Sequence, residues 1–328
     1  MLKNKFISST LILLIGGFIT KILGMIIRII TTRFIGVYGM SLYSLIMPTF
    51  SLIVSIAIFA LPTSISKLVS SSKYQSKKIG KSALYIVLAI NLFFISLITL
   101  FSGFISNNLL HEPLTRPLLI ASLVTIPFIS VSSIIKGYFF GKQNMVPSTI
   151  SNIFEQVIRL VLIFLFLPKI VSFDAFYGII FIILLNIISE CLSIFIMYLF
   201  LPEKISFTNI SYNHECTKDI LRISVPSVSS KIIGNISYFF EPIIITTLLL
   251  YLGVNKDYIV LEYGLFNSFA ISLLLIPSFF VGAISQALLP EIGKNLCNNK
   301  KLVKRRIKQT VIISLILGIF FCTIINIY

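Results

Sequence analysis

Two lysines occupy the same short phrase within long apolar stretches of this chain: Lys21 in Thr-Lys-Ile-Leu-Gly and Lys231 in Ser-Lys-Ile-Ile-Gly. A lysine at the centre of a membrane helix costs roughly 2.5–3.5 kcal/mol on insertion scales, so its repetition needs a physical reason. A lysine that lines a water-filled space avoids this cost and attracts anions. The repeated phrase predicts two related halves with a positively charged cavity between them.

The first apolar stretch arranges small and cationic residues on one helical face. Gly17, Lys21, Gly24 and Arg28 follow the i, i+4, i+7 and i+11 spacing. The glycines predict close approach of a neighbouring helix, and the two cations predict an anion site. The alternative is that Lys21 and Arg28 extend to the membrane interface instead of lining a cavity.

The later stretch repeats this spacing with Lys231 and Gly234, and Glu241 follows next to Pro242. Pro242 removes a backbone hydrogen bond and predicts a kink. Pro48 and Pro277 stand at corresponding places in the two expected halves, which predicts a hinge or packing role for both.

Acidic residues also lie within apolar stretches. Glu155 and Arg159 are four residues apart, which predicts either an internal ion pair or a polar stripe on a cavity. Glu190 has no obvious local partner, so it pairs with a cation from another helix or serves as a proton site. With Lys21, Arg28, Lys231 and Glu241, seven such groups facing lipid would cost on the order of 20 kcal/mol, so most must face one another or water.

The elements that position these residues follow from the composition. The chain has 328 residues, 57% hydrophobic and 12% charged, whereas soluble domains are about a quarter charged. It is therefore expected to be an all-α, polytopic membrane protein, because helices satisfy their own backbone hydrogen bonds in lipid. Nine spans are expected, at residues 6–32, 42–66, 82–105, 117–138, 149–167, 175–200, 220–251, 263–290 and 309–328.

The basic residues predict the orientation of these spans. Nineteen of the 27 Lys and Arg residues fall in alternate connections and the N-terminal segment, whereas four fall in the opposite connections. Cytoplasmic loops carry such an excess, so we expect a multi-pass cell-membrane protein with a cytoplasmic N-terminus. The net charge of +16 is concentrated in these loops, which argues against nucleic acid as a partner.

A repeat divides the chain. Tyr-Gly pairs, similarly spaced prolines and Lys-rich segments make spans one to three resemble spans seven to nine. We expect a six-helix lobe at residues 1–200, a cytoplasmic linker at 201–218 and a three-helix partial lobe at 219–328, with the second lobe truncated.

Enzyme chemistry is not expected. The sequence has no P-loop, HExxH or GxSxG motif, and its four cysteines lack metal-ligand or redox spacing. Neither a cofactor nor a metal site is predicted. Transport would then depend on ion gradients, membrane potential or the substrate gradient.

Two stretches carry a family resemblance: GVYGMSLYSLIMP at 36–48, and KGYFFGKQNMVPST at 136–149 continuing into EQVIR at 155–159. They resemble the stage V sporulation protein B and polysaccharide exporter family of the multidrug/oligosaccharidyl-lipid/polysaccharide (MOP) flippase superfamily. The resemblance implies a MATE-like bundle of two lobes that alternates between inward-open and outward-open states. It also implies a substrate such as an undecaprenyl-diphosphate-linked precursor of wall or spore cortex.

In this interpretation Lys21, Arg28 and Lys231 bind the diphosphate, and Glu155, Arg159, Glu190 and Glu241 line the cavity or couple an ion. Lys21 matches a basic phrase of the lipid II flippases directly, and Arg28 matches with a shift of one residue. The expected partners are the lipid-linked glycan, membrane lipids and cell-wall biosynthesis proteins. The alternatives are a MATE-type drug or cation antiporter, and a truncated membrane protein that does not transport.

Overall fold

The computed structural model describes residues 2–202, 214–271 and 300–327, with scattered helical positions between 274 and 292. The regular elements of these residues are all helices, as expected from the composition. Seven helical stretches are long and apolar enough to cross a membrane, which supports the multi-pass assignment. The nine expected spans are an approximate count, because the first two form one continuous element.

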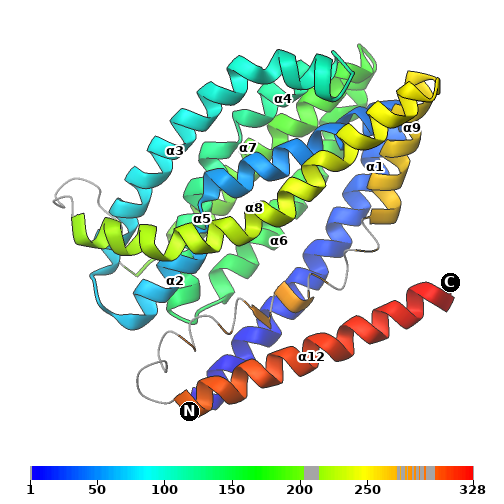
Figure 1. The fold of residues 1–328 in the computed structure, drawn as a ribbon. Helices are drawn as coiled ribbons and strands as arrows, with labels where there is room; N and C mark the ends of the chain where they lie inside the picture. The colour runs from blue at the N-terminus through cyan, green and yellow to red at the C-terminus, as the bar shows by residue number, and fades with distance from the viewer. Residues whose placement is uncertain are drawn as a thin grey trace.

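That element is α1 (Leu2–Ile58), which breaks at Gly36. At 1.5 Å per residue its 57 residues would extend roughly 85 Å, nearly three times the hydrocarbon thickness of a bilayer. Gly36 has φ 83°, a conformation that residues with a Cβ rarely adopt. Figure 1 shows the chain running from the N-terminus to the opposite end of the bundle and then turning back. The two arms of α1 thus correspond to the first two expected spans.

The rest of the first lobe alternates between the two ends of the bundle. The chain continues through α2 (Leu61–Ser71), α3 (Ser76–Phe104), the π-helix η1 (Ile105–Leu109), α4 (Thr115–Leu123), α5 (Ile126–Gly141), α6 (Val146–Val171) and α7 (Ala175–Leu199). Asp174 caps α7 by accepting a hydrogen bond from the Phe176 backbone N–H at 2.8 Å. We call the end that carries residues 67–81 the Lys-rich end, and the end that carries Gly36 the opposite end.

We call the helices up to α7 the first lobe and those from α8 (His214–Tyr251) onward the second lobe. After α8 come α9 (Lys256–Leu265) and the π-helix η2 (Phe266–Ile271). The last five residues of the expected 201–218 linker are therefore helical, and residues 203–213 lie outside the described part. In Figure 1 the final helix, α12 (Lys300–Ile327, red), begins near the N-terminal end of α1 in this view and lies away from α2–α7. Pro277 and most of the expected 263–290 span also lie outside the described residues.

The main core fills the centre of the first lobe. Its fully buried members come from the second arm of α1 and from α4, α5, α6 and α7, and include Leu45, Ile46, Leu118, Leu119, Ile126, Ile163 and Leu167. Val260 and Tyr263 of α9 join this core, so α9 packs against the first lobe.

The two lobes touch at both ends of the bundle. At the Lys-rich end, the hydroxyl groups of Ser64 and Ser224 lie 2.5 Å apart. At the opposite end, the hydroxyl groups of Ser44 and Ser268 lie 2.6 Å apart. Pro48 lies inside the second arm of α1, four residues after Ser44, and Pro242 lies inside α8; both are buried.

Candidate binding site: a cationic cavity in the first lobe

An open cavity of about 330 Å³ lies among α1, α6 and α7. Three cations line it: Lys21 and Arg28 from the first arm of α1, and Arg159 from α6. The remaining polar walls are hydroxyl and amide side chains, namely Thr20, Thr31, Tyr43, Gln156 and Asn186. Lys21 therefore lines a cavity, and this cavity lies inside one lobe.

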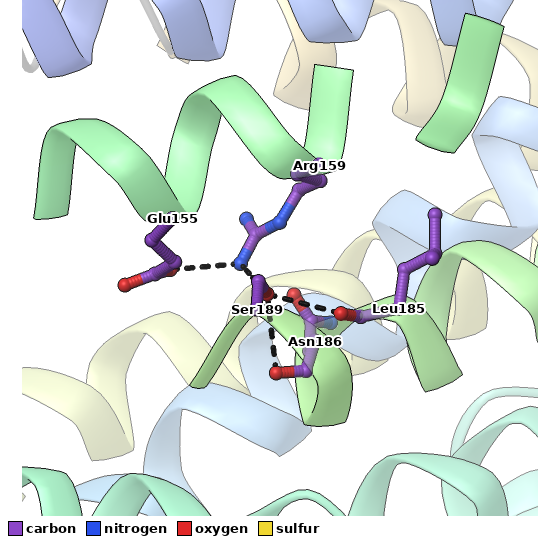
Figure 2. A network of polar contacts seen from close by, with 5 residues as sticks. All are labelled: Glu155, Arg159, Leu185, Asn186 and Ser189. Carbon is purple, nitrogen blue, oxygen red and sulfur yellow. Dashed lines mark hydrogen bonds and ion pairs between the residues drawn. The ribbon is translucent and has the colours of Figure 1, made fainter. Parts of the chain in front are cut away.

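Arg159 is the cation with the most clearly defined partners, shown in Figure 2. Its Nη2 donates to Glu155 Oε1 at 2.9 Å and to Ser189 Oγ at 3.0 Å. Ser189 in turn donates to the backbone carbonyl of Leu185 at 3.0 Å, with the Asn186 carbonyl at 3.2 Å. The predicted Glu155–Arg159 ion pair is therefore present, and α7 helps to hold it.

These contacts leave part of the guanidinium uncommitted. Arg159 Nε is buried and has no hydrogen-bond partner among the described residues. An arginine carries five N–H donors, and the two contacts just described both use Nη2. Arg159 nevertheless lines the cavity, and the planar fork of a guanidinium suits phosphate oxygens.

Lys21 and Arg28 differ in their surroundings. Lys21 forms no hydrogen bond or ion pair with any residue that the structure describes, although it lies on the cavity wall. Arg28 Nη1 donates to the backbone carbonyl of Ser268 at 2.5 Å, so this cation also connects the first lobe to η2. The cavity consequently holds three positive charges, of which Glu155 neutralises one.

Glu190 lies close to this group without a cation of its own. Its side chain is 9% exposed, and its Oε2 has no hydrogen-bond partner within the described part of the chain. Glu155, 8% exposed, is near enough to interact electrostatically with Glu190. The ion pair with a cation from another helix, expected as one alternative, is therefore not formed among the described residues. The other alternative, a proton site, stays a prediction.

Lys231 does not line this cavity. It is exposed on α8, and its expected role in binding the diphosphate stays a prediction. Further along α8, Glu241 Oε1 is buried and has no hydrogen-bond partner among the described residues. Asn267 donates to the Tyr263 hydroxyl at 2.9 Å and to the Tyr238 hydroxyl at 3.2 Å. This polar cluster lies next to Ser268, whose backbone carbonyl accepts a hydrogen bond from Arg28.

The glycines of the repeated phrase have a different role from the one expected. A Cβ added at Gly24 or Gly234 would meet no described atom within 4 Å, so neither marks a close helix contact. Gly24 instead lines the cavity and leaves its space open. Close approach occurs at Gly16, where a Cβ would meet Thr149 Cγ2 at 1.9 Å. The carbonyl of Gly17 accepts a hydrogen bond from Thr20 Oγ1 at 2.8 Å.

Comparison with known proteins places the chain in a family. A sequence profile of the family described as polysaccharide biosynthesis protein matches residues 6–296. The chain belongs to this family. Among relatives in Bacillus subtilis (strain 168), it is 32% identical to stage V sporulation protein B over 97% of its own length and 64% of that protein. It is 27% identical to the lipid II flippase MurJ over 49% of its length and 32% of that protein.

Solved transporters share the fold of this chain. A MATE crystal structure in the straight conformation matches with a TM-score of 0.72 and 16% identity, covering 97% of this chain and 71% of that one. A MOP superfamily transporter from Pyrococcus furiosus matches with a TM-score of 0.71 and 15% identity, covering 97% and 70%. The resemblance seen in the sequence is confirmed, as is the MATE-like architecture. The chain spans less than two thirds of stage V sporulation protein B.

Several residues that line the cavity were not predicted from the sequence. Tyr43 and Thr31 reach the same cavity as Lys21 because α1 folds back at Gly36, and no local pattern marks them. Gln156 and Asn186 could be identified by their polarity within apolar helices, but not by the cavity that they share.

Proposed function

We propose that this chain binds the anionic headgroup of a lipid-linked glycan in the first-lobe cavity and takes part in moving it across the cell membrane as a flippase. The observation that carries the proposal is that Lys21, Arg28 and Arg159 line one cavity. A diphosphate supplies the negative charge that this wall lacks, and the amide and hydroxyl groups beside it suit hydrogen bonding to a sugar. The N-terminus would be cytoplasmic.

Relatives support the same activity. The family is described by polysaccharide biosynthesis, and MurJ is named as a lipid II flippase. An undecaprenyl-diphosphate-linked precursor is the substrate class that fits both descriptions and the cavity charge. Membrane lipids would surround the lipid tail while the headgroup crosses, and cell-wall biosynthesis proteins would be the partners that supply or consume the substrate.

Alternating access in this proposal rests on the contacts between lobes at the opposite end of the bundle. Glu112, 4% exposed, accepts from Lys256 Nζ at 2.9 Å across the two lobes. Together with the Ser44–Ser268 contact, this pair would separate when the cavity opens to that side of the membrane.

The test measures binding of undecaprenyl diphosphate to the purified full chain in detergent, with undecaprenol as the ligand that lacks phosphate. Lys21→Gln should weaken diphosphate binding by roughly 10- to 100-fold, since a hydrogen bond to a charged group contributes about 1.5–3 kcal/mol. Arg159→Lys should weaken it as well, while its charge still pairs with Glu155.

Arg33→Gln is the matched control, because Arg33 is exposed on α1 and does not line the cavity. Undecaprenol should bind all variants equally. Unchanged diphosphate affinity in both Lys21→Gln and Arg159→Lys would reject the cavity as the headgroup site.

The second candidate, a cation or drug antiporter, has one specific observation in its favour. Glu190 is buried with an unpartnered oxygen, and such a carboxyl is able to exchange a proton for a cation. Efflux of ethidium that disappears in Glu190→Gln and survives in Lys21→Gln would favour this alternative. The cationic cavity favours the anionic substrate.

A further inference from the structure

A second cavity, of about 480 Å³, lies at the Lys-rich end of the bundle and shares no residue with the first. It opens among α2, α3, α5 and the residues that follow α7. We propose that this cavity binds the headgroup of an anionic phospholipid, separately from the transported substrate.

The charges on its wall come from two different elements. Lys77 lies in the first turn of α3, and Lys142 follows the end of α5. Lys142 Nζ lies 5.9 Å from the centre of the Tyr138 ring, so its ammonium group sits above an aromatic wall of the same cavity. Gln75 and Ser76 add neutral hydrogen-bonding groups. Two lysines that converge on polar groups suit a phosphodiester.

The rest of the lining is largely apolar. It includes Ile65 and Val69 of α2, Ile134 and Ile135 of α5, and Leu201. A free phosphate ion has no apolar part that could contact these side chains. A phospholipid has a glycerol backbone and acyl chains next to its phosphate. Basic pockets between membrane helices recognise anionic lipid headgroups in this way.

The cavity is not a consequence of loose packing. Where α5 meets α2, a Cβ at Gly141 would meet the Ser66 carbonyl at 2.9 Å, and one at Gly137 would meet the Pro62 Cα at 3.0 Å. On the α3 side, by contrast, a Cβ at Gly80 would meet nothing within 4 Å. A glycine inside a helix costs roughly 1 kcal/mol relative to alanine. No packing contact among the described residues requires a glycine at position 80. Its missing side chain leaves space in the cavity that it lines.

The experiment uses the absence of tryptophan from the sequence. Phe200→Trp, next to Leu201, introduces a single tryptophan beside the cavity without removing a lining residue. The full chain is reconstituted in vesicles that contain brominated phosphatidylglycerol or brominated phosphatidylcholine, and quenching reports the preference for the anionic lipid.

We expect a preference for phosphatidylglycerol that falls by about fivefold for each lysine removed in Lys77→Gln and Lys142→Gln, as ~1 kcal/mol per basic residue near the surface implies. Gly80→Leu should fill the cavity, since its Cβ has free space, and reduce the preference with no change in charge. This second variant separates occupancy of the cavity from general electrostatic attraction.

The matched control is Lys67→Gln with Lys81→Gln, two lysines of the same end that do not line the cavity. It should retain the preference. Equal loss in the control pair, or full preference in Gly80→Leu, would overturn the proposal in favour of diffuse surface charge. Glycerol phosphate added to the vesicles should not compete; full competition would reassign the site to a soluble phosphate compound.

Discussion

Gly264 is the position where a single methyl group should change the relation between the two lobes. A Cβ there would meet Ser41 Oγ at 2.1 Å and Ser41 Cα at 2.3 Å. Because the Cα belongs to the backbone, no side-chain rotation relieves this contact. To reach ordinary contact at 3.4 Å, α9 and the second arm of α1 must separate by about 1.1 Å. Gly264→Ala should therefore open the lobes at the opposite end of the bundle.

The size of the effect follows from what this separation breaks. Overpacking of a tight contact costs roughly 1–3 kcal/mol. Separation also weakens the Ser44–Ser268 hydrogen bond, which contributes about 0.5–1.5 kcal/mol, and the charge-assisted bond from Arg28 to the Ser268 carbonyl, which contributes about 1.5–3 kcal/mol. The joined state should lose about 3–7 kcal/mol in total. Even the lower value shifts the equilibrium between joined and separated lobes by roughly 150-fold.

Disulfide cross-linking measures this equilibrium at each end. In a background where the native cysteines are replaced by serine, Ser44→Cys with Ser268→Cys reports the opposite end. Ser64→Cys with Ser224→Cys reports the Lys-rich end, where the hydroxyl groups are 2.5 Å apart. Gly264→Ala should reduce the first cross-link severalfold and leave the second at its original yield or above.

Gly24→Ala is the matched control, because its Cβ would meet no described atom within 4 Å. It should leave both cross-links unchanged. An undiminished Ser44–Ser268 cross-link in Gly264→Ala would refute the reasoning, since the lobes would then tolerate a methyl group at their closest approach.

Two further predictions concern single polar contacts. Ser189→Ala removes one acceptor that positions Arg159, and Ser189 itself does not line the cavity. It should weaken binding of undecaprenyl diphosphate by roughly 2- to 10-fold, less than Lys21→Gln, since only part of the about 1.5–3 kcal/mol of a charge-assisted hydrogen bond would be lost; an effect as large as that of Lys21→Gln would contradict it. At the Lys-rich end, the hydrogen bond to Asp219 raises the pKa of Lys73 above 10.5, so the stability that this pair adds is present below pH 10.5 and is lost as pH rises through the raised value. Thermal unfolding should thus show no contribution from the pair to the pH dependence between pH 6 and 9, and a small loss above pH 10.5 that Asp219→Asn lacks.

The helices could be predicted from the sequence because hydrophobic length is a local property. Apolar stretches mark the spans directly, and the spacing of Glu155 and Arg159 was enough to predict their ion pair, which the structure has at 2.9 Å. The break at Gly36 lies between the expected spans 6–32 and 42–66, because the length of each apolar stretch already separates these two spans. Continuity of α1 through that break was not predictable, because it depends on how its two arms pack.

The composition of the cavity depends on contacts that are distant in sequence. Arg159 joins Lys21 because α6 packs on α1, and Tyr43 joins them because α1 returns past its own first arm. The repeated phrase placed Lys21 and Lys231 in one expected site, but the structure leaves Lys231 exposed on α8. A sequence repeat indicates that two helices have related patterns, and it does not determine which cavity each helix lines. The role of Lys231 stays a prediction.

The choice between an anionic and a cationic substrate depends on which charges around the first-lobe cavity are already balanced. Glu155 is 8% exposed and already pairs with Arg159, while Glu190 is 9% exposed and does not line the cavity. Lys21 lies on the wall with no partner among the described residues. A cationic substrate would add charge to a wall that already carries more positive than negative charge, and it would meet no accessible carboxylate there. A diphosphate would balance the unpaired cations, and for this reason we expect the affinity of the cavity to depend on phosphate charge.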